Sequence, residues 1–190
     1  MITGGLGRGR VPRVQAQVFA VTDVHYPPEG GARAAVVLAS DPRFENVVAE
    51  RVVDLATVAA YQPGRFYLRE LPALQAVLDD VTGLSLLIVD GYVDLEPGGA
   101  RPGLGAHCHA VFGVPVIGVA KTRFRSADHA IEVHRGTGHR PLYVTSAGMD
   151  LPAAANLVTQ MAGPFRLPSA LKRVDGLARG FAPPPGVAKR

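Results

Sequence analysis

The segment from residue 85 to residue 121, SLLIVDGYVDLEPGGARPGLGAHCHAVFGVPVIGVAK, decides the fold that we expect for this chain. It holds two short apolar runs, 85–90 and 114–120, and each is bounded in the way typical of a fully buried strand. Between them lie a loop rich in glycine and proline and a helix candidate, 104–112, which ends before Gly113. Buried strands that alternate with a helix indicate parallel strands inside a sheet.

The residues on either side of this segment predict the rest of the fold. Three apolar runs precede it, and the short turns between them predict an antiparallel meander of three strands at 17–25, 32–40 and 46–56. Helical spacing of apolar residues predicts a helix after Glu70, and similar patterns predict two further strands and two terminal helices at 130–134, 142–145, 151–161 and 168–179. We therefore expect an α/β fold, with a mixed sheet flanked by helices.

Length and composition limit the classes of protein. A chain of 190 residues with 47% hydrophobic residues predicts one domain over 1–190, with flexible tails at 1–13 and 181–190. The single cysteine, Cys108, excludes disulfide frameworks and cysteine-based zinc sites. No apolar run is long enough for a membrane span and no signal peptide is evident, so we expect a cytoplasmic protein without a membrane partner. The net charge of +4 suits a polyanionic partner, although many basic proteins bind no nucleic acid.

Two acids stand at the ends of predicted strands. Asp23 follows the apolar residues of the first strand, and Asp90 closes the run that begins at residue 85. A single such acid is usually a turn or helix cap. Two of them on neighbouring strands would crowd like charges at one edge of the sheet, and a divalent cation relieves that repulsion. Oxygen ligands favour Mg²⁺ or Mn²⁺, and ligands of α/β sheets bind at this edge.

Three motifs give the chain a resemblance to a known family. Residues 87–91 (LIVDG), 103–107 (GLGAH) and 114–121 (VPVIGVAK) are similar to the central motif of the endonuclease V family. Residues 61–70 (YQPGRFYLRE) and 23–26 (DVHY) are similar to two further motifs, in the family's order and with compatible spacing. The resemblance extends from about residue 18 to about residue 178.

The resemblance implies a ribonuclease H-like fold and a metal-dependent endonuclease. Such an enzyme cuts DNA or RNA one nucleotide beyond deoxyinosine or inosine, on the 3′ side, with Mg²⁺ or its substitute Mn²⁺, and works as a monomer. The implied metal-binding carboxylates are Asp23, Glu70, Asp90 and Asp175. Lys121 would contact the phosphate or the attacking water, and Tyr61 would belong to the wedge beside the flipped base. Backbone N–H groups in the glycine-rich loop could contact that base, with the candidates Gly91, Gly103 and Gly105.

Each of these residues has a plainer interpretation. Glu70 could simply be a carboxylate at the start of a helix, where its charge interacts favourably with the helix dipole. Asp175 could be an exposed acid on an amphipathic helix. Tyr61 could be a core aromatic, and Lys121 could extend from a buried strand to water. The pair His107 and His109 suggests metal ligands, but on a helix this spacing points the two side chains apart, so we do not expect them to share a metal.

Four positions depart from the family pattern. Glu96 stands where the family has a histidine after the motif aspartate, and Met149 replaces another family histidine. Tyr92 and Asp94 add bulk and charge to the same loop. Three hypotheses follow: an endonuclease acting at inosine, a nuclease with the same metal site and another substrate, or a nucleic-acid-binding protein with little catalysis.

Overall fold

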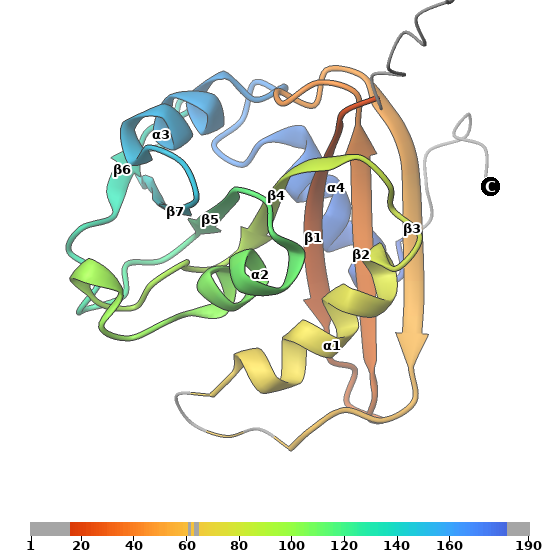
Figure 1. Ribbon diagram of the computed structural model, residues 1–190. Helices are drawn as coiled ribbons and strands as arrows, with labels where there is room; N and C mark the ends of the chain where they lie inside the picture. The colour runs from red at the N-terminus through yellow and green to blue at the C-terminus, as the bar shows by residue number, and fades with distance from the viewer. Residues whose placement is uncertain (1–15, 61, 63–64, 182–190) are drawn as a thin grey trace, which may run out of the picture.

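The computed structural model describes residues 16–60, 62 and 65–181 of the chain. Within these residues the chain forms a seven-stranded sheet with four α-helices and one short 3₁₀ helix, η1. In chain order the elements are β1 Val18–His25, β2 Ala32–Ala39, β3 Val47–Leu55, α1 Tyr67–Leu78, β4 Leu84–Asp90, η1 Pro97–Gly99, α2 Leu104–Phe112, β5 Val116–Ala120, β6 Ile131–Val133, β7 Leu142–Ala147, α3 Leu151–Gln160 and α4 Ser169–Ala178. The predicted mixed sheet flanked by helices is confirmed (Figure 1).

The first three strands form the predicted antiparallel meander. β1 pairs with β2, and β2 pairs with β3, both antiparallel. The turn between β1 and β2 needs glycine at Gly31, because its φ is +75° and an added Cβ would lie 2.4 Å from the carbonyl oxygen of Leu55. This turn follows β1, which continues for two residues after Asp23.

The central strands are parallel. β4 pairs with β1 on one side and with β5 on the other, and α2 provides the crossover between β4 and β5. The strand order is β3-β2-β1-β4-β5-β7-β6, with β7 antiparallel to both β5 and β6. Because β1, β4 and β5 run in one direction, their carboxyl ends meet at one edge of the sheet.

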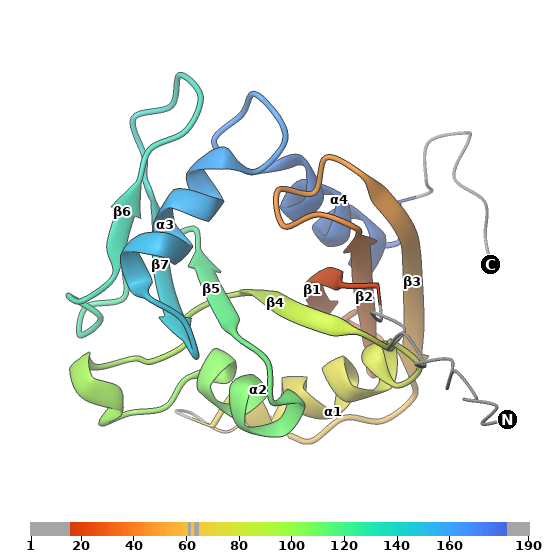
Figure 2. The same ribbon diagram turned by 45° about the horizontal axis from the view of Figure 1, so that its top comes forward.

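Helices cover both faces of the sheet. One apolar cluster joins α1 and α2 to side chains such as Ala20 and Val36, and the other joins α3 and α4 to side chains such as Val21 and Ile88. Figure 2 shows α1 and α2 below the sheet and α3 and α4 above it. The alternation of side chains along a strand assigns each residue of β1 and β4 to one of these two layers.

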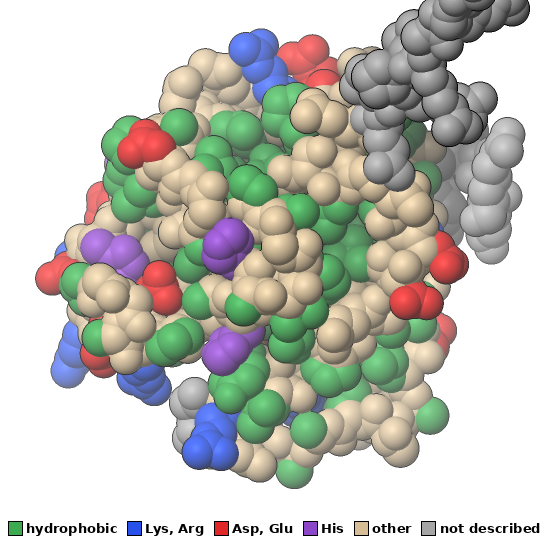
Figure 3. All heavy atoms as spheres, viewed as in Figure 1, with side chains coloured by type: hydrophobic (Ala, Val, Ile, Leu, Met, Phe, Trp, Pro, Cys, Tyr) green, Lys and Arg blue, Asp and Glu red, His purple; other side chains and the backbone are tan. Residues whose placement is uncertain are grey.

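The face formed by α1, α2 and the meander is largely uncharged. In Figure 3 hydrophobic and neutral atoms dominate this view, and the charged side chains of the described residues stand mainly at its margins. None of the described helices combines the length and the apolar character needed to span a bilayer.

One boundary differs from the prediction in a way that affects the site. α1 begins at Tyr67, so Glu70 lies inside the first helical turn instead of ahead of the helix. The helix has no side-chain cap at Phe66, and the sequence therefore lacks the usual signal for its start. Tyr61, the predicted tail 1–13 and all but Phe181 of the predicted tail 181–190 lie outside the described residues.

Candidate metal centre

Asp23 and Asp90 lie side by side at the carboxyl ends of two neighbouring parallel strands. Thr22 of β1 is in register with Val89 of β4, so the next residue of each strand is an aspartate beside the other. Asp23 lies on the same face of β1 as Val21, because residues two apart in a strand share a face. This is the face that α4 covers.

Asp175 reaches the same place from α4. The buried residues of this helix, such as Val174 and Leu177, pack on the sheet, and Asp175 stands beside them over the ends of β1 and β4. The carboxylate groups of Asp23, Asp90 and Asp175 each offer an oxygen, and these oxygens all lie within 4.8 Å of one another. Asp175 is therefore part of a cluster and not an isolated surface acid.

Lys121 supplies a positive charge to this cluster. It follows β5, and its Nζ donates to Asp90 Oδ2 at 2.6 Å and to Asp175 Oδ1 at 3.5 Å. Burial opposes the charged form, but the hydrogen bond and the charge of Asp90 dominate and raise the pKa of Lys121. The side chain thus turns toward the acids instead of extending into water.

Two of the acids resist ionisation. Burial, followed by the charge of Asp90, raises the pKa of Asp23 from 3.8 to about 6. Burial, followed by the charges of Asp23 and Asp90, raises the pKa of Glu70 well above its ordinary value. Among the described residues no lysine or arginine forms an ion pair with Glu70. Negative charge is therefore in excess of its local compensation.

Asp175 has the opposite tendency. Burial works to raise its pKa, but the hydrogen bond from Arg179 and the charge of Lys121 outweigh burial and lower it. Arg179 Nε lies 3.1 Å from Asp175 Oδ2, one helical turn away. Asp175 is therefore the carboxylate of the cluster that loses its proton most readily among those with a shifted pKa.

A cleft of about 300 Å³ opens over these groups. Its walls include Asp23, Glu70, Asp90, Lys121 and Asp175, so the structure brings together all of the acids and the lysine named from the sequence. Glu70 is 7% exposed and does not belong to the group of oxygens within 4.8 Å. It approaches from the α1 side, where it shares a second, much smaller cavity with Asp23 and Asp90.

The donor set suits a hard divalent cation. All of the converging ligand atoms are carboxylate oxygens, which Mg²⁺ and Mn²⁺ prefer and which soft-metal sites lack. Burial first, and the neighbouring charge of Asp90 second, raise the pKa of Asp23, and the positive charge of Lys121 offsets this only in part. A divalent cation is the group that would relieve both the repulsion and the burial of these charges.

The three glycines named for base contacts have local structural reasons of their own. Gly103 N–H donates to the carbonyl of Val93, Gly105 N–H to that of Tyr92, and Gly91 N–H to that of Val119. An added Cβ at Gly105 would lie 2.6 Å from Val93 Cγ2, whereas Gly91 has a φ of +134° and open space beside it. Their use as base contacts stays a prediction, and it would require these N–H groups to change partner.

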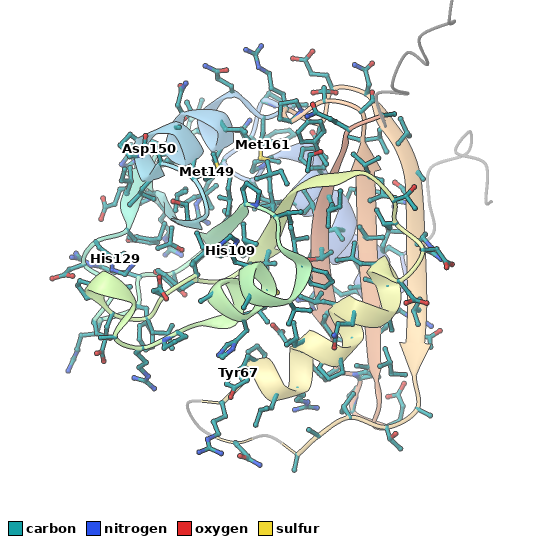
Figure 4. The ribbon with its side chains drawn as sticks, viewed as in Figure 1. Tyr67, His109, His129, Met149, Asp150 and Met161 are labelled. Carbon is teal, nitrogen blue, oxygen red and sulfur yellow. The ribbon has the colours of Figure 1, made fainter. Side chains whose placement is uncertain are left out.

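The two histidines of α2 do not converge, as expected. The ring of His107 stacks on Tyr67 with centroids 3.5 Å apart, whereas His109 Nδ1 lies 2.7 Å from the carbonyl oxygen of Val114. Figure 4 shows His109 and Tyr67 on opposite sides of α2. Glu96 immediately precedes η1 without a side-chain capping bond and is not among the residues that line the cleft. Met149 packs against the core cluster that includes α3.

Four further residues line the cleft and were given no role from the sequence: Val24, His25, Phe66 and Arg179. Arg179 holds Asp175, and its spacing of four residues in a helix is a signal that the sequence offered. His25 follows Asp23 on the same strand, and Phe66, which is 43% exposed, precedes α1. His25 and Phe66 lie inside the family-like motifs 23–26 and 61–70, but neither motif assigned a role to them.

Comparisons with known proteins agree with one another. The family model described as Endonuclease V matches residues 9–137. The endonuclease V of Thermococcus kodakarensis is 35% identical over 168 residues, which cover 86% of this chain and 79% of the relative. The crystal structure of endonuclease V from Streptomyces avermitilis superposes with a TM-score of 0.72 at 26% identity, covering 86% and 80% of the two chains. That of Ciona intestinalis endonuclease V, in complex with DNA containing an inosine followed by a ribo-adenosine, has a TM-score of 0.71 at 16% identity, with coverages of 86% and 84%.

Proposed function

This chain belongs to the endonuclease V family of hydrolases, with its ribonuclease H-like fold, and we propose that it cuts a phosphodiester bond one nucleotide 3′ to deoxyinosine or inosine. The observation that carries the proposal is the meeting of Asp23, Asp90 and Asp175 within 4.8 Å, next to Lys121. Phosphodiester hydrolysis needs a nucleophilic water and stabilisation of the leaving oxygen, and carboxylate-held divalent cations are suited to both.

The acids and the lysine of the site would have different roles. Asp23, Asp90 and Asp175 would hold Mg²⁺, or Mn²⁺ as its substitute, with Glu70 as a further carboxylate on the α1 side of the cleft. A bound divalent cation would supply positive charge at the phosphate and a more acidic water. Lys121 would neutralise part of the charge on the phosphate, because its ammonium group already lies at the mouth of the carboxylate cluster.

The proposal that this chain recognises inosine is supported by its membership of the endonuclease V family. A solved relative from Ciona intestinalis with the same fold is in complex with inosine-containing DNA, and this supports an inosine-containing substrate for this chain. A target base inside a duplex would have to leave the stack to be read. Tyr61 would belong to the wedge beside that base, and the N–H groups of Gly91, Gly103 and Gly105 would contact it. We expect the protein to act as a monomer, as one domain over 1–190, in the cytoplasm.

One observation favours a second candidate, a nuclease with altered substrate choice. Tyr92 is 8% exposed, and its hydroxyl donates to the carbonyl of Thr122 and accepts from the N–H of Phe124. Tyr92, which departs from the family pattern, thus connects the loop after β4 to the segment after β5 by two hydrogen bonds. If this loop contacts the base, its side chains decide which base is accepted. Asp94, a second residue that departs from the family pattern, lies in the loop.

The experiment compares labelled oligonucleotides of DNA and RNA, single- and double-stranded, each with inosine or adenosine at one position. Wild type, Asp90→Asn and the control Asp79→Asn are incubated with Mg²⁺, Mn²⁺ or EDTA; Asp79 is an exposed acid at the end of α1. Metal-dependent cutting 3′ to inosine, lost only in Asp90→Asn, supports the proposal. Equal cutting of adenosine strands supports the second candidate. Tight binding without cutting in any metal would leave a binding protein and contradict both.

A further inference from the structure

A second groove lies next to the catalytic cleft, and we propose that it binds the phosphate backbone of the nucleic-acid strand that leaves the cleft on one side of the cut. The inference rests on the proposed function, because it assigns a path to that same substrate. We call this groove the flanking groove, and the residues that matter to the argument are His25, Pro27, Pro28, Arg33, Asp54 and Arg179.

The flanking groove is continuous with the cleft. His25 and Arg179 line both cavities, so a chain that enters one can pass directly into the other. The groove has a volume of about 510 Å³, compared with about 300 Å³ for the cleft. It follows the turn between β1 and β2 and the end of β3, which lie together at the lower edge of the sheet in Figure 1.

Arg33 provides a cation on the wall of this groove. Its Nε and one Nη donate to the two carboxylate oxygens of Asp54 at 2.6 and 3.1 Å, which leaves the other Nη without a bonded acceptor among the described residues. That Nη lies 2.9 Å from the position that a Cβ would take at Gly180, where φ is +86°. A side chain at residue 180 would therefore contact this Nη, and the Arg33 side chain keeps 38% of its surface exposed.

Arg179 provides a second cation, at the junction of the two cavities. Its Nε is bonded to Asp175, and its side chain is 51% exposed. No acceptor among the described residues is bonded to its Nη groups, which can therefore donate to a phosphate. A strand that passes from the cleft into the groove would meet Arg179 first and Arg33 after it.

A nucleic-acid strand fits this groove better than a peptide or a lipid surface does. The groove combines guanidinium groups, which match phosphate geometry, with apolar surface from Pro27, Pro28 and Leu55 on which a sugar or base can rest. Two acids also line it: Asp54, which is paired with Arg33, and the exposed Glu29. Its volume is within the range of about 300–1,000 Å³ seen for pockets that hold small ligands, so it has room for a nucleotide unit. The groove shares His25 and Arg179 with the cleft, where such a strand is proposed to be cut.

The test reverses one charge and uses a matched control. Arg33→Glu is compared with Arg51→Glu, because Arg51 also forms an exposed ion pair on the same sheet, with Asp80 at 2.9 Å, and lines neither cavity. Surface pairs of this kind contribute about 0–1 kcal/mol to stability, so both variants should fold, which circular dichroism melting checks. Binding is measured by fluorescence anisotropy, and cutting by single-turnover assay, on inosine strands shortened stepwise from either end.

We expect Arg33→Glu to raise the Kd for the full-length strand about three- to tenfold and to reduce the slope of log K against log salt by about 0.7, the value for one lost contact to a single strand. The difference should disappear when the strand is shortened from one end only. Equal binding and cutting by Arg33→Glu and Arg51→Glu at every length would overturn the inference. Failure of wild type to cut any strand would instead contradict the proposed function, and failure to bind any strand would contradict both.

Discussion

Replacing Asp23 with asparagine is expected to stabilise the metal-free protein at alkaline pH. The same change is expected to lower the affinity of the site for a divalent cation. The pKa of Asp23 is raised from 3.8 to about 6, first by burial and then by the charge of Asp90. Asparagine keeps the oxygen that accepts from the N–H of Val24 at 2.9 Å, so the local backbone contact survives. The change removes the charge and little else.

The magnitude and the sign follow from the two pKa values. A difference of about two pH units corresponds to about 3 kcal/mol, at about 1.4 kcal/mol for each unit. Below about pH 4 the carboxyl group is protonated in both the folded and the unfolded chain, and it costs nothing. As the pH rises the unfolded chain loses this proton first, so the folded state loses stability until the pH passes about 6.

Urea unfolding at pH 4.5 and pH 8, followed by circular dichroism in EDTA, measures this effect. We expect Asp23→Asn to be more stable than wild type at pH 8, by at most about 3 kcal/mol, and to gain much less at pH 4.5. Saturating Mg²⁺ at about 100 times its Kd should stabilise wild type by about 2.7 kcal/mol and the variant by less. A variant that is less stable than wild type at pH 8 in EDTA would refute the reasoning, and Asp79→Asn should show no such gain.

Three further predictions concern the loop and the chemistry. Tyr92→Phe removes a hydroxyl group that forms two hydrogen bonds to the segment after β5, so it should destabilise the protein by about 1–3 kcal/mol and slow the cutting step more than it weakens binding; an unchanged urea midpoint would count against this. Gly105→Ala should cost about 1–3 kcal/mol, because its Cβ would lie 2.6 Å from Val93 Cγ2 and 2.9 Å from Val93 Cα, and normal thermal unfolding of that variant would contradict the packing. The rate at limiting Mg²⁺ should rise with pH through about 6, because Asp23 must lose its proton to hold the cation, and a pH-rate profile that is flat from pH 5 to pH 8 would argue against its role as a ligand.

The order of the elements and the carboxyl edge of the sheet could be predicted because both depend on local patterns. Apolar runs that end in Asp90 and Lys121 mark buried strands whose ends must be near one another in a parallel sheet. The start of α1 could not be predicted, because Phe66 offers no capping side chain. The place of Glu70 inside the first turn of α1, and not ahead of the helix, depends on that start and was therefore not predicted.

The flanking groove and the fastening of the loop depend on contacts between residues far apart in the chain. Arg33 and Arg179 line one groove because α4 packs behind the meander, and neither local sequence indicates this. Tyr92 is conspicuous in the sequence as a bulky residue, but its partner Phe124 becomes evident only when β4 and β5 are adjacent. Long-range packing of this kind leaves no periodic pattern to read.

The most direct test of the metal centre is an anomalous diffraction map from crystals soaked in Mn²⁺. We predict a peak bounded by the carboxylate oxygens of Asp23, Asp90 and Asp175, with Lys121 no longer in contact with Asp90. A map with no peak between these three carboxylates, or with the Lys121–Asp90 contact still in place beside a peak elsewhere, would contradict the assignment of this cluster as the catalytic metal site.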